Sequence, residues 1–391
     1  MTGLDEVNYH RLADFRVAKQ QERDERCTPV LAARSQEGRI TLEQVRQDGR
    51  KSKAQASVRS YHQEPTIREH LERAGRGVAE MGDPRNEESN SGSKQARERG
   101  RREQPERLEN ALQELEKLQN RKQGEKAQSK VGVSSSDPQA RVLHQSEGGL
   151  ALSYHAQISA DAAQGLLVGG AVTQEANDTG PLLAAVERIA ERLQRKPEQR
   201  VADAGYSTGA AIEERAERQV DFLGSLPRED ACRGRSAPQR LPPSAFLFQP
   251  ETNRSVCPEG KYLRQERYWK KERGLVSRRD LAPAEDGRSW ARKPECGPEN
   301  RGGRGILRWE ESAGVLALRQ KMETEEARAS YRRRGRVVEF CHAWIKSKLG
   351  LRQFHVRGLV KVQMEMLWAC LTYNLQQWIR LRKPLPTAAS G

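Results

Sequence analysis

The middle of the chain alternates short strand-like runs with amphipathic helical segments, and this alternation restricts the fold more than any other feature. Residues 150–159 (LALSYHAQIS) and 166–174 (LLVGGAVTQ) are strand-like and are joined by a short polar loop, which predicts a hairpin. Further on, a helix that begins with a proline, a strand, a second helix and another strand are expected at residues 181–194, 199–205, 207–218 and 220–226. Strands that alternate with helices predict an α/β fold in which part of the sheet is parallel.

Composition changes divide the rest of the chain. Residues 66–130 are rich in Glu, Arg, Lys and Gln, and residues 228–305 in Pro, Gly and charged residues, so both regions are expected to be insertions. The longest helical stretch runs from about Trp309 to Leu381, and Gly350 is a plausible helix stop inside it. We therefore expect a helical N-terminal part (1–38), the first strand of the core (39–65), a charged helical or flexible insertion (66–133), the core (134–227), an irregular cysteine-containing insertion (228–305), a C-terminal helical part of the core (306–383) and a tail (384–391).

Two local patterns predict elements before the core. Residues 39–48 (RITLEQVRQD) place apolar side chains as a strand would, and the pair Asp48-Gly49 suits the end of that strand; residues 12–33 are predicted to be helical. In the charged insertion, apolar residues repeat at helical spacing, which predicts one packed helix beside a flexible stretch at 82–102. These apolar positions are Leu108, Ala111, Leu112, Leu115 and Leu118.

Net charge indicates the kind of partner. The 69 Lys and Arg residues exceed the 54 Asp and Glu residues by 69 − 54, which gives +15. This charge favours a polyanion and by itself permits DNA, RNA, the ribosome or anionic lipid as the partner. No apolar run approaches the length of a membrane span, and the N-terminal sequence has no hydrophobic signal region. The six cysteines are widely spaced, unlike a secreted disulfide framework, so a reducing cytoplasm is the expected location.

Three acids have the positions of metal ligands. Asp48 and Asp203 each end a predicted strand, where open α/β sheets place their sites, and Glu339 lies in a late helix among basic residues. Converging carboxylates need a cation, and oxygen ligands suit Mg²⁺ or Mn²⁺. Two such ions about 3.5–4 Å apart would support phosphodiester chemistry. An aspartate at a strand end is more often a turn or cap residue, so this pattern alone is only moderately specific.

A series of motifs carries a family resemblance. In chain order the segments are ADFRVAKQQERDE (13–25), QDGRKSKAQAS (47–57), SDPQARVL (136–143), LSYHAQISAD (152–161), VTQEANDTGPL (172–182), VADAGYST (201–208), VCPEGKYL (256–263) and YRRRGRVVEFCHAWIKSKLGLRQFHVRGL (331–359). With these motifs in this order, the chain resembles the DDE transposases of bacterial insertion sequences, most closely the insertion sequence 1182 group.

The resemblance implies a fold and roles for particular residues. It implies an RNase H-like catalytic core in which Asp48, Asp203 and Glu339 hold the metal ions. The family signature around the third acid is matched by Tyr331, Arg334, Glu339 and Lys346, and the flanking residues, with Arg333 and Arg336, are expected to bind DNA. Helical spacing independently places Glu339 and Lys346 two turns apart on one face, so the acid can meet a metal while the base meets a phosphate.

Alternative assignments remain for individual residues. Asp137 also lies in a family-like motif and competes with Asp48 as the first acid; we favour Asp48 because it closes the first core strand, whereas Asp137-Pro138 has turn chemistry. Cys232, Cys257 and Cys296 lack zinc-ligand spacing, so no metal is assigned to them. His342 follows Glu339 by three residues and could face the site, although a helical histidine is more often a packing or hydrogen-bonding residue.

These features predict a transposase that cleaves DNA at the terminal inverted repeats of its element and joins the 3′ ends to target DNA. The protein is expected to be a homodimer in the synaptic complex and to associate with the nucleoid. The alternative is a truncated remnant that binds DNA without cleaving it. Arg50 stands where the family commonly has Thr, and His342-Ala343 replace a usual Phe-Gly. Residues 1–38 are expected to be a remnant of the helical domain that binds the element ends, which is longer in most members. An RNA-associated protein is a weaker alternative, since no stacking platform or RNA-binding signature is visible.

Overall fold

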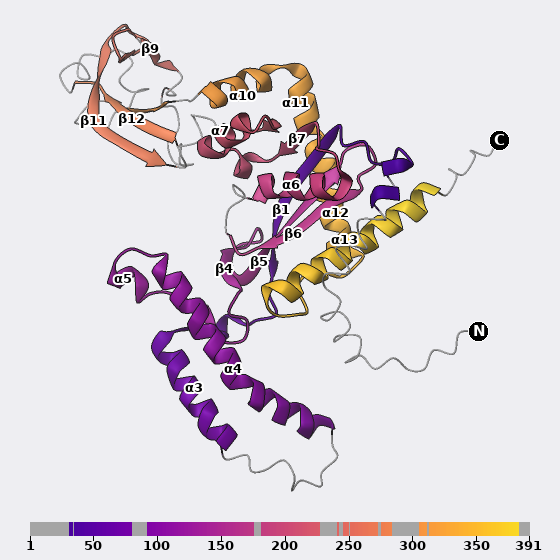
Figure 1. Cartoon of the computed structure of the whole chain (residues 1–391). Helices are drawn as coiled ribbons and strands as arrows, with labels where there is room; N and C mark the ends of the chain where they lie inside the picture. The colour runs from indigo at the N-terminus through magenta and orange to yellow at the C-terminus, as the bar shows by residue number, and fades with distance from the viewer. Residues whose placement is uncertain are drawn as a thin grey trace. The chain divides into compact units, whose positions relative to one another are not determined.

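The computed structural model describes residues 31–33, 35–79, 92–175, 181–226, 241, 245–249, 251–272, 275–283, 305–310 and 313–382 (Figure 1). The chain forms two compact units, which are described separately below. The first unit comprises residues 1–197 and 335–391, and the second comprises residues 198–334. The mixture of sheets and helices agrees with the predicted α/β class.

A long strand, β5 (Leu150–Asp161), is central to the sheet of the first unit. On one edge it pairs antiparallel with β1 (Gln44–Lys53); on the other it pairs antiparallel with β4 (Arg141–His144) and β6 (Leu167–Thr173). The strands β5 and β6 form the predicted hairpin.

The first strand differs from its prediction. It begins at Gln44 and continues to Lys53, so Asp48 lies in its middle, opposite Ile158, and not at its end. Upstream, Leu42 adopts a left-handed backbone with a φ of 56°, and its N–H donates to the Asp161 carboxylate. This turn ends the apolar run before the strand begins. The second half of β1 is polar and therefore escaped the pattern of alternating apolar residues.

Helices cover both faces of this sheet. On one face, α12 (Arg334–Ser347) and α13 (Leu359–Arg382) pack against β5 and β6 in a cluster that includes Leu167. The next residue, Val168, points to the opposite face and packs with Ile189 of α6 (Pro181–Leu193). Beyond α12, Gly350 has a φ of 73°, which agrees with its predicted role near a helix stop.

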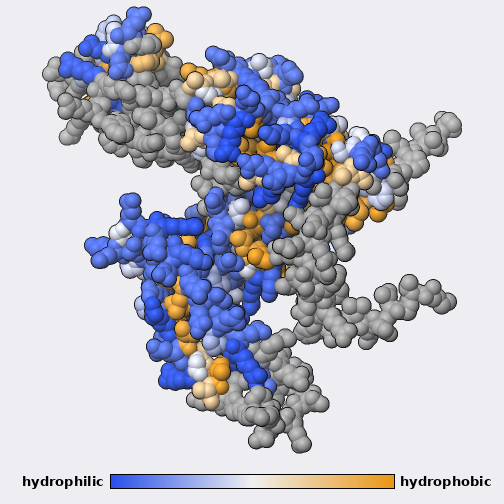
Figure 2. All heavy atoms as spheres, in the orientation of Figure 1, coloured by the Kyte–Doolittle hydropathy of each residue, from blue (hydrophilic) through white to orange (hydrophobic). Residues whose placement is uncertain are grey.

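The charged insertion forms a helical hairpin. Its helices are α3 (Glu64–Ala79), α4 (Gly92–Asn120) and the short α5 (Glu125–Gln128). The buried residues Leu108, Ala111 and Leu115 pack with Ile67. The surface of the hairpin is mostly hydrophilic with a narrow apolar strip (Figure 2).

The prediction of a single helix and a flexible stretch at 82–102 was wrong from Gly92 onward, because Glu, Arg and Gln are good helix formers. Residues 80–91 lie outside the described residues. The base of the insertion is closed by β2 (Tyr61–Gln63), which follows a short 3₁₀ turn at Val58–Ser60 and pairs with β3 (Gly132–Ser134).

The second unit contains the predicted parallel strands. The strands β7 (Gln199–Ala202) and β8 (Asp221–Gly224) are parallel and are connected through α7 (Gly209–Glu217). The helices α10 (Ala313–Glu323) and α11 (Glu325–Arg332) complete this part, and Ala327 packs between β7 and β8 side chains. The α/β alternation was therefore interpreted correctly here.

Residues 228–305 were expected to be irregular, and the structure corrects this. An antiparallel sheet has the order β13-β12-β11-β10-β9, with strands Leu247–Gln249 (β9), Arg254–Val256 (β10), Tyr262–Glu272 (β11), Leu275–Leu281 (β12) and Gly305–Glu310 (β13). The glycines and prolines gave the segment its irregular appearance, but turns between short strands also require such residues. The strand β13 includes Trp309, so the helical part begins at Ala313.

Candidate active site

A strand and a helix of the first unit bring Asp48 and His342 together. The Asp48 side chain is 18% exposed. Its strand partner Ile158 belongs to the same buried cluster as Val338 and Ile345 of α12, so Asp48 lies on the face that α12 covers. The Nε2 atom of His342 lies 3.6 Å from Asp48 Oδ2. This contact joins the predicted first acid to the helix that carries the predicted third acid.

His342 is held as a neutral imidazole. Its side chain is 7% exposed, and burial, assisted by the positive charge of Arg50, lowers the pKa of His342 to about 4. A hydrogen bond with the Asp48 main chain acts in the opposite direction. The Nε2 atom has no hydrogen-bond partner among the described residues, and 3.6 Å is too long for such a bond to Asp48. A buried nitrogen therefore faces the carboxylate unsatisfied.

Glu339 lies one turn before His342 on α12 and is exposed. A Cβ atom placed on Gly335 would lie only 2.7 Å from Glu339 Oε1, so the carboxylate occupies space that a side chain at 335 would fill. This direction is usual for helices, in which side chains lean toward the N-terminus. Gly335 thus permits the position of the predicted third acid.

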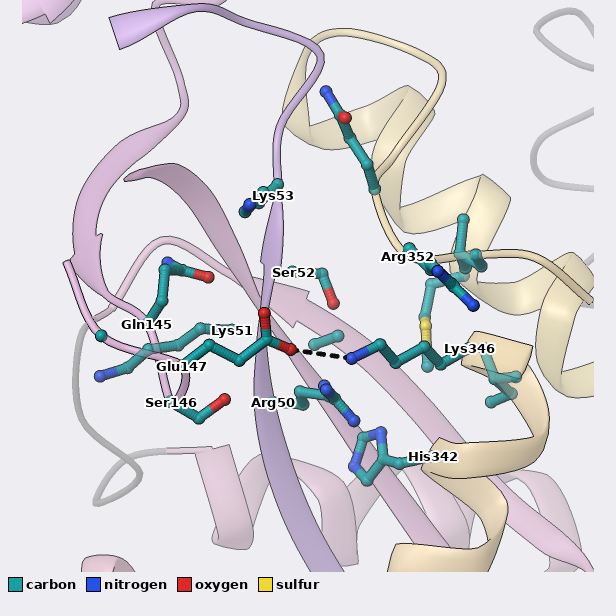
Figure 3. A pocket seen from close by; sticks show the side chains of 16 residues that line it. Arg50, Lys51, Ser52, Lys53, Gln145, Ser146, Glu147, His342, Lys346 and Arg352 are labelled. Atoms are coloured by element: carbon teal, nitrogen blue, oxygen red, sulfur yellow. Dashed lines mark hydrogen bonds and ion pairs between the residues drawn. The ribbon is translucent and has the colours of Figure 1, made fainter. Parts of the chain in front are cut away.

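A basic pocket of about 320 Å³ opens beside His342 in the same unit (Figure 3). Lys346 of α12 forms an ion pair with Glu147, its Nζ lying 3.0 Å from Glu147 Oε1. Glu147 is the only acid in the described lining, and the pKa of its carboxyl is lowered by Lys346 and less strongly by Lys53 and Arg50. The bases that line the pocket are Arg50, Lys51, Lys53, Lys346 and Arg352.

Sequence reasoning identified Lys346 in this pocket and missed the bases of β1. The signal was the run RKSK directly after Asp48-Gly49. A positive pocket occupied by one exposed carboxylate has the electrostatic character of a phosphate site.

Asp203 lies in the second unit and directly follows β7, as predicted. It caps a short 3₁₀ turn (Ala204–Tyr206), and its Oδ1 accepts a hydrogen bond of 2.9 Å from the N–H of Gly205. The buried Arg215 donates a hydrogen bond to the Tyr206 carbonyl, and its guanidinium lies over the Phe222 ring. The hydrogen bond holds the turn that Asp203 caps. Arg215 was not singled out in the sequence, because one arginine on an amphipathic helix gives no signal.

The predicted DNA-binding residues are divided between the two units. Tyr331 packs against the cluster of Val201 and Leu223 in the second unit, and the Arg334 guanidinium lies 5.7 Å from the centre of its ring. Arg333 is exposed in the second unit, and Arg336 is exposed on α12 of the first. The expected single helix through this segment is two helices, because α11 ends at Arg332 and α12 begins at Arg334.

Asp137, the competing first acid, is fully buried and has a structural environment. Its Oδ1 accepts hydrogen bonds from the Tyr154 hydroxyl at 2.7 Å and from the N–H of Gly358 at 3.1 Å. Burial raises the pKa of this carboxyl, and the hydrogen bonds partly offset the effect. Asp137 thereby fastens the start of α13 to β5.

Metal ligation by the three predicted acids stays a prediction. Asp48 and Glu339 belong to the first unit and Asp203 to the second. Across the described part of the chain, no group of three or more His, Cys, Asp or Glu side chains has a metal-binding arrangement. Cys257 is a buried free thiol whose sulfur accepts a hydrogen bond from the N–H of Lys261 in a turn. Cys232 and Cys296 lie outside the described residues.

Residues 256–379 match the family model for the transposase DDE domain. The matched segment contains Glu339 and Lys346, whereas Asp48 and Asp203 lie outside it. No curated protein matches the chain significantly. None of the described helices is both long and apolar enough to cross a membrane. The chain is thus similar to DDE transposases over this segment, which supports a transposase-type enzyme with DNA as its partner.

Proposed function

We propose that this protein is the transposase of an insertion sequence of the 1182 group, and that it cleaves and joins DNA with Asp48, Asp203 and Glu339 as ligands of divalent metal ions. The observation that carries the proposal is the contact of Asp48 with His342 of α12, the helix that also carries Glu339 and lines a basic pocket. This helix lies within the matched family segment. The proposal includes an RNase H-like core and a homodimeric synapse.

The pair of Asp48 and His342 fits a divalent cation. Asp48 offers carboxylate oxygens, and the unsatisfied nitrogen of His342 leaves a buried position beside Asp48 that a cation would satisfy. Glu339 and Asp203 are the further ligands in this proposal. When bound, Mg²⁺ or Mn²⁺ supplies charge stabilisation to the attacking and leaving oxygens of the phosphodiester. The nucleophile is water in the cleavage step and a DNA 3′-hydroxyl in the joining step, so the chain needs no covalent intermediate.

The bases beside the acids hold the DNA backbone in this proposal. Lys346 and Arg50 lie on the same side of the sheet as His342 and would contact phosphates next to the scissile bond. Tyr331 and Arg334, with Arg333 and Arg336, would contact the cleaved end. Binding through phosphates releases counterions, so affinity should fall steeply as salt rises.

Cleavage of DNA from the flanks of the gene tests the proposal. A plasmid carrying the inverted repeats that flank the coding sequence is incubated with the purified full chain and Mg²⁺, and nicked and joined products are separated on gels. Asp203→Asn should remove cleavage, because the amide keeps the cap on the turn but is a poor metal ligand. The exposed Glu217→Gln in the same unit is the matched control and should cleave normally. Cleavage that survives Asp203→Asn contradicts the triad.

A non-catalytic DNA-binding remnant is the second candidate. Arg50 favours this candidate, because it stands at the motif position where the family commonly has Thr. Arg50 is a cation, and it lies close enough to His342 to lower the pKa of that imidazole. This candidate predicts salt-dependent DNA binding without cleavage under either Mg²⁺ or Mn²⁺. The same gels, run beside a binding assay, separate the two functions.

A further inference from the structure

We propose that His342 supplies a nitrogen ligand to the divalent metal position at Asp48. The inference rests on the proposed function, since it assumes that Asp48 holds a metal, and it adds a residue to the three acids of the motif. It also explains why a histidine is buried against this carboxylate in α12.

The distance between the two side chains suits a shared ion. The 3.6 Å between His342 Nε2 and Asp48 Oδ2 is too long for a hydrogen bond. Two donor atoms that each lie about 2.1 Å from one ion, at an angle of about 90–120°, are roughly 3.0–3.6 Å apart. The atoms are therefore separated as ligands of one cation would be.

The buried ring nitrogen has the position of a ligand atom. Nε2 of His342 has no hydrogen-bond partner among the described residues and lies beside Asp48 Oδ2. Metal-binding histidines commonly donate their other N–H to a neighbouring acceptor, which directs the lone pair of the free nitrogen at the metal. In this proposal Nε2 is the nitrogen that binds the ion.

A nitrogen ligand changes which ion the site prefers. Mg²⁺ is a hard cation that takes oxygen ligands, whereas imidazole suits transition metals. Asp48 with His342 should therefore bind Mn²⁺ more tightly than Mg²⁺, and the difference should shrink when the imidazole is removed. In a purely packing role, His342 would affect stability but not the choice of ion.

Electron paramagnetic resonance of Mn²⁺ bound to the full chain tests the assignment directly. Electron spin-echo modulation from an imidazole ¹⁴N should appear in the wild type, disappear in His342→Phe and in His342→Asn, and persist in His355→Gln. His355 is the matched control because it is exposed and pairs with Glu365.

Mn²⁺ affinity should fall on the order of tenfold or more in both His342 variants. Two replacements are used because Phe fills the buried space and Asn keeps a polar group; thermal unfolding verifies that each folds.

The outcomes separate this inference from the proposed function. Mn²⁺ that binds the wild type and is lost in Asp48→Asn, but shows no ¹⁴N modulation, overturns the role of His342 and leaves the acids as ligands. A ¹⁴N signal that persists in His342→Phe also overturns it. If the wild type binds no Mn²⁺, with or without DNA, the proposed metal site and the role of His342 both fail.

Discussion

Asp48 and Asp137 are two aspartates of the same unit, each in a family-like motif, and their surroundings differ in kind. Asp137 is fully buried and accepts hydrogen bonds from Tyr154 and Gly358, which hold β5 and the start of α13 together. Asp48 is partly exposed and faces the unsatisfied nitrogen of a buried histidine beside a basic pocket.

The difference shows what separates a structural acid from a candidate catalytic one. The Asp137 carboxylate uses one oxygen, Oδ1, to connect β5 with the start of α13, while its buried Oδ2 has no hydrogen-bond partner among the described residues. Asp48 instead lies 3.6 Å from the Nε2 atom of His342, and a cation can satisfy a carboxylate and a nitrogen lone pair together. Glu339 lies one helical turn from His342 on α12. Predictions that distinguish these two environments are therefore the most informative.

The largest expected difference is in DNA cleavage. Asp48→Asn should reduce the cleavage rate by about 10³-fold, because removing a metal ligand costs several kcal/mol of transition-state stabilisation. Asp137→Asn should stay within a few fold of the wild type, since its amide oxygen can still accept from Tyr154. Initial rates on end-containing DNA measure both; equal losses in the two variants would remove the distinction between the acids.

For the free energy of unfolding, substitution of Asp137 should have the larger effect and substitution of Asp48 the smaller one. Asp137→Ala leaves the Tyr154 hydroxyl and the Gly358 N–H without their acceptor and should lower the free energy of unfolding by about 2–3 kcal/mol. Urea unfolding measures this effect, with Asp48→Ala as the control, which should lose much less.

The pH dependence sharpens the stability result. Burial raises the pKa of Asp137 above its unfolded value near 3.8, so the native state retains this proton to higher pH than the unfolded state does. The stabilisation from the protonated form is complete below the unfolded pKa and is lost as pH rises through the native pKa. Asp137→Asn should therefore gain stability relative to the wild type as the pH rises above the unfolded pKa and through the native pKa of Asp137. An unchanged difference across that range would show that burial does not control this carboxyl.

The smallest expected effect concerns the pocket beside Asp48. The Glu147 side chain is 74% exposed and forms an ion pair with the ammonium group of Lys346. Its carboxylate lies where a DNA phosphate would bind in the proposed complex. Glu147→Gln should raise DNA affinity several-fold and steepen its salt dependence, because one competing negative charge is removed. Lys346→Gln should act in the opposite direction. Fluorescence anisotropy across a salt series measures both changes; an affinity unaffected by either variant would exclude phosphate binding in this pocket.

Local pattern predicted much of the fold. The hairpin of β5 and β6, the helix that starts at Pro181 and the parallel pair β7–β8 follow from apolar periodicity and turn residues. The position of β1 was missed because its second half carries Arg50, Lys51 and Lys53, which face a polar pocket and have no apolar pattern. The antiparallel sheet of the second unit was missed because its short strands lie between turn-forming residues.

The candidate site was predicted only as separate residues. Asp48, Glu339 and Lys346 were selected from motifs and helical spacing, and His342 was noted only as one helical turn from Glu339. Its contact with Asp48 depends on the pairing of β1 with β5 and on the packing of α12 against that face, although residues 54–149 lie between the two strands. No local pattern encodes such a register, and the same limit applies to Glu147, which reaches Lys346 from a hairpin turn.

The short pairing of β2 with β3 has a consequence for how the chain folds. It brings Gln63 and Gly132 opposite each other at the base of the helical insertion, and the hydroxyls of Ser60 and Ser134 lie 2.7 Å apart beside them. Once this neck has closed, β1 no longer searches for β5 across the full intervening sequence, but only across residues 54–60 and 135–149 on the two sides of the neck. The central pairing of the core is thereby insulated from the length of the insertion, which can grow or shrink at little entropic cost to the strands that carry Asp48.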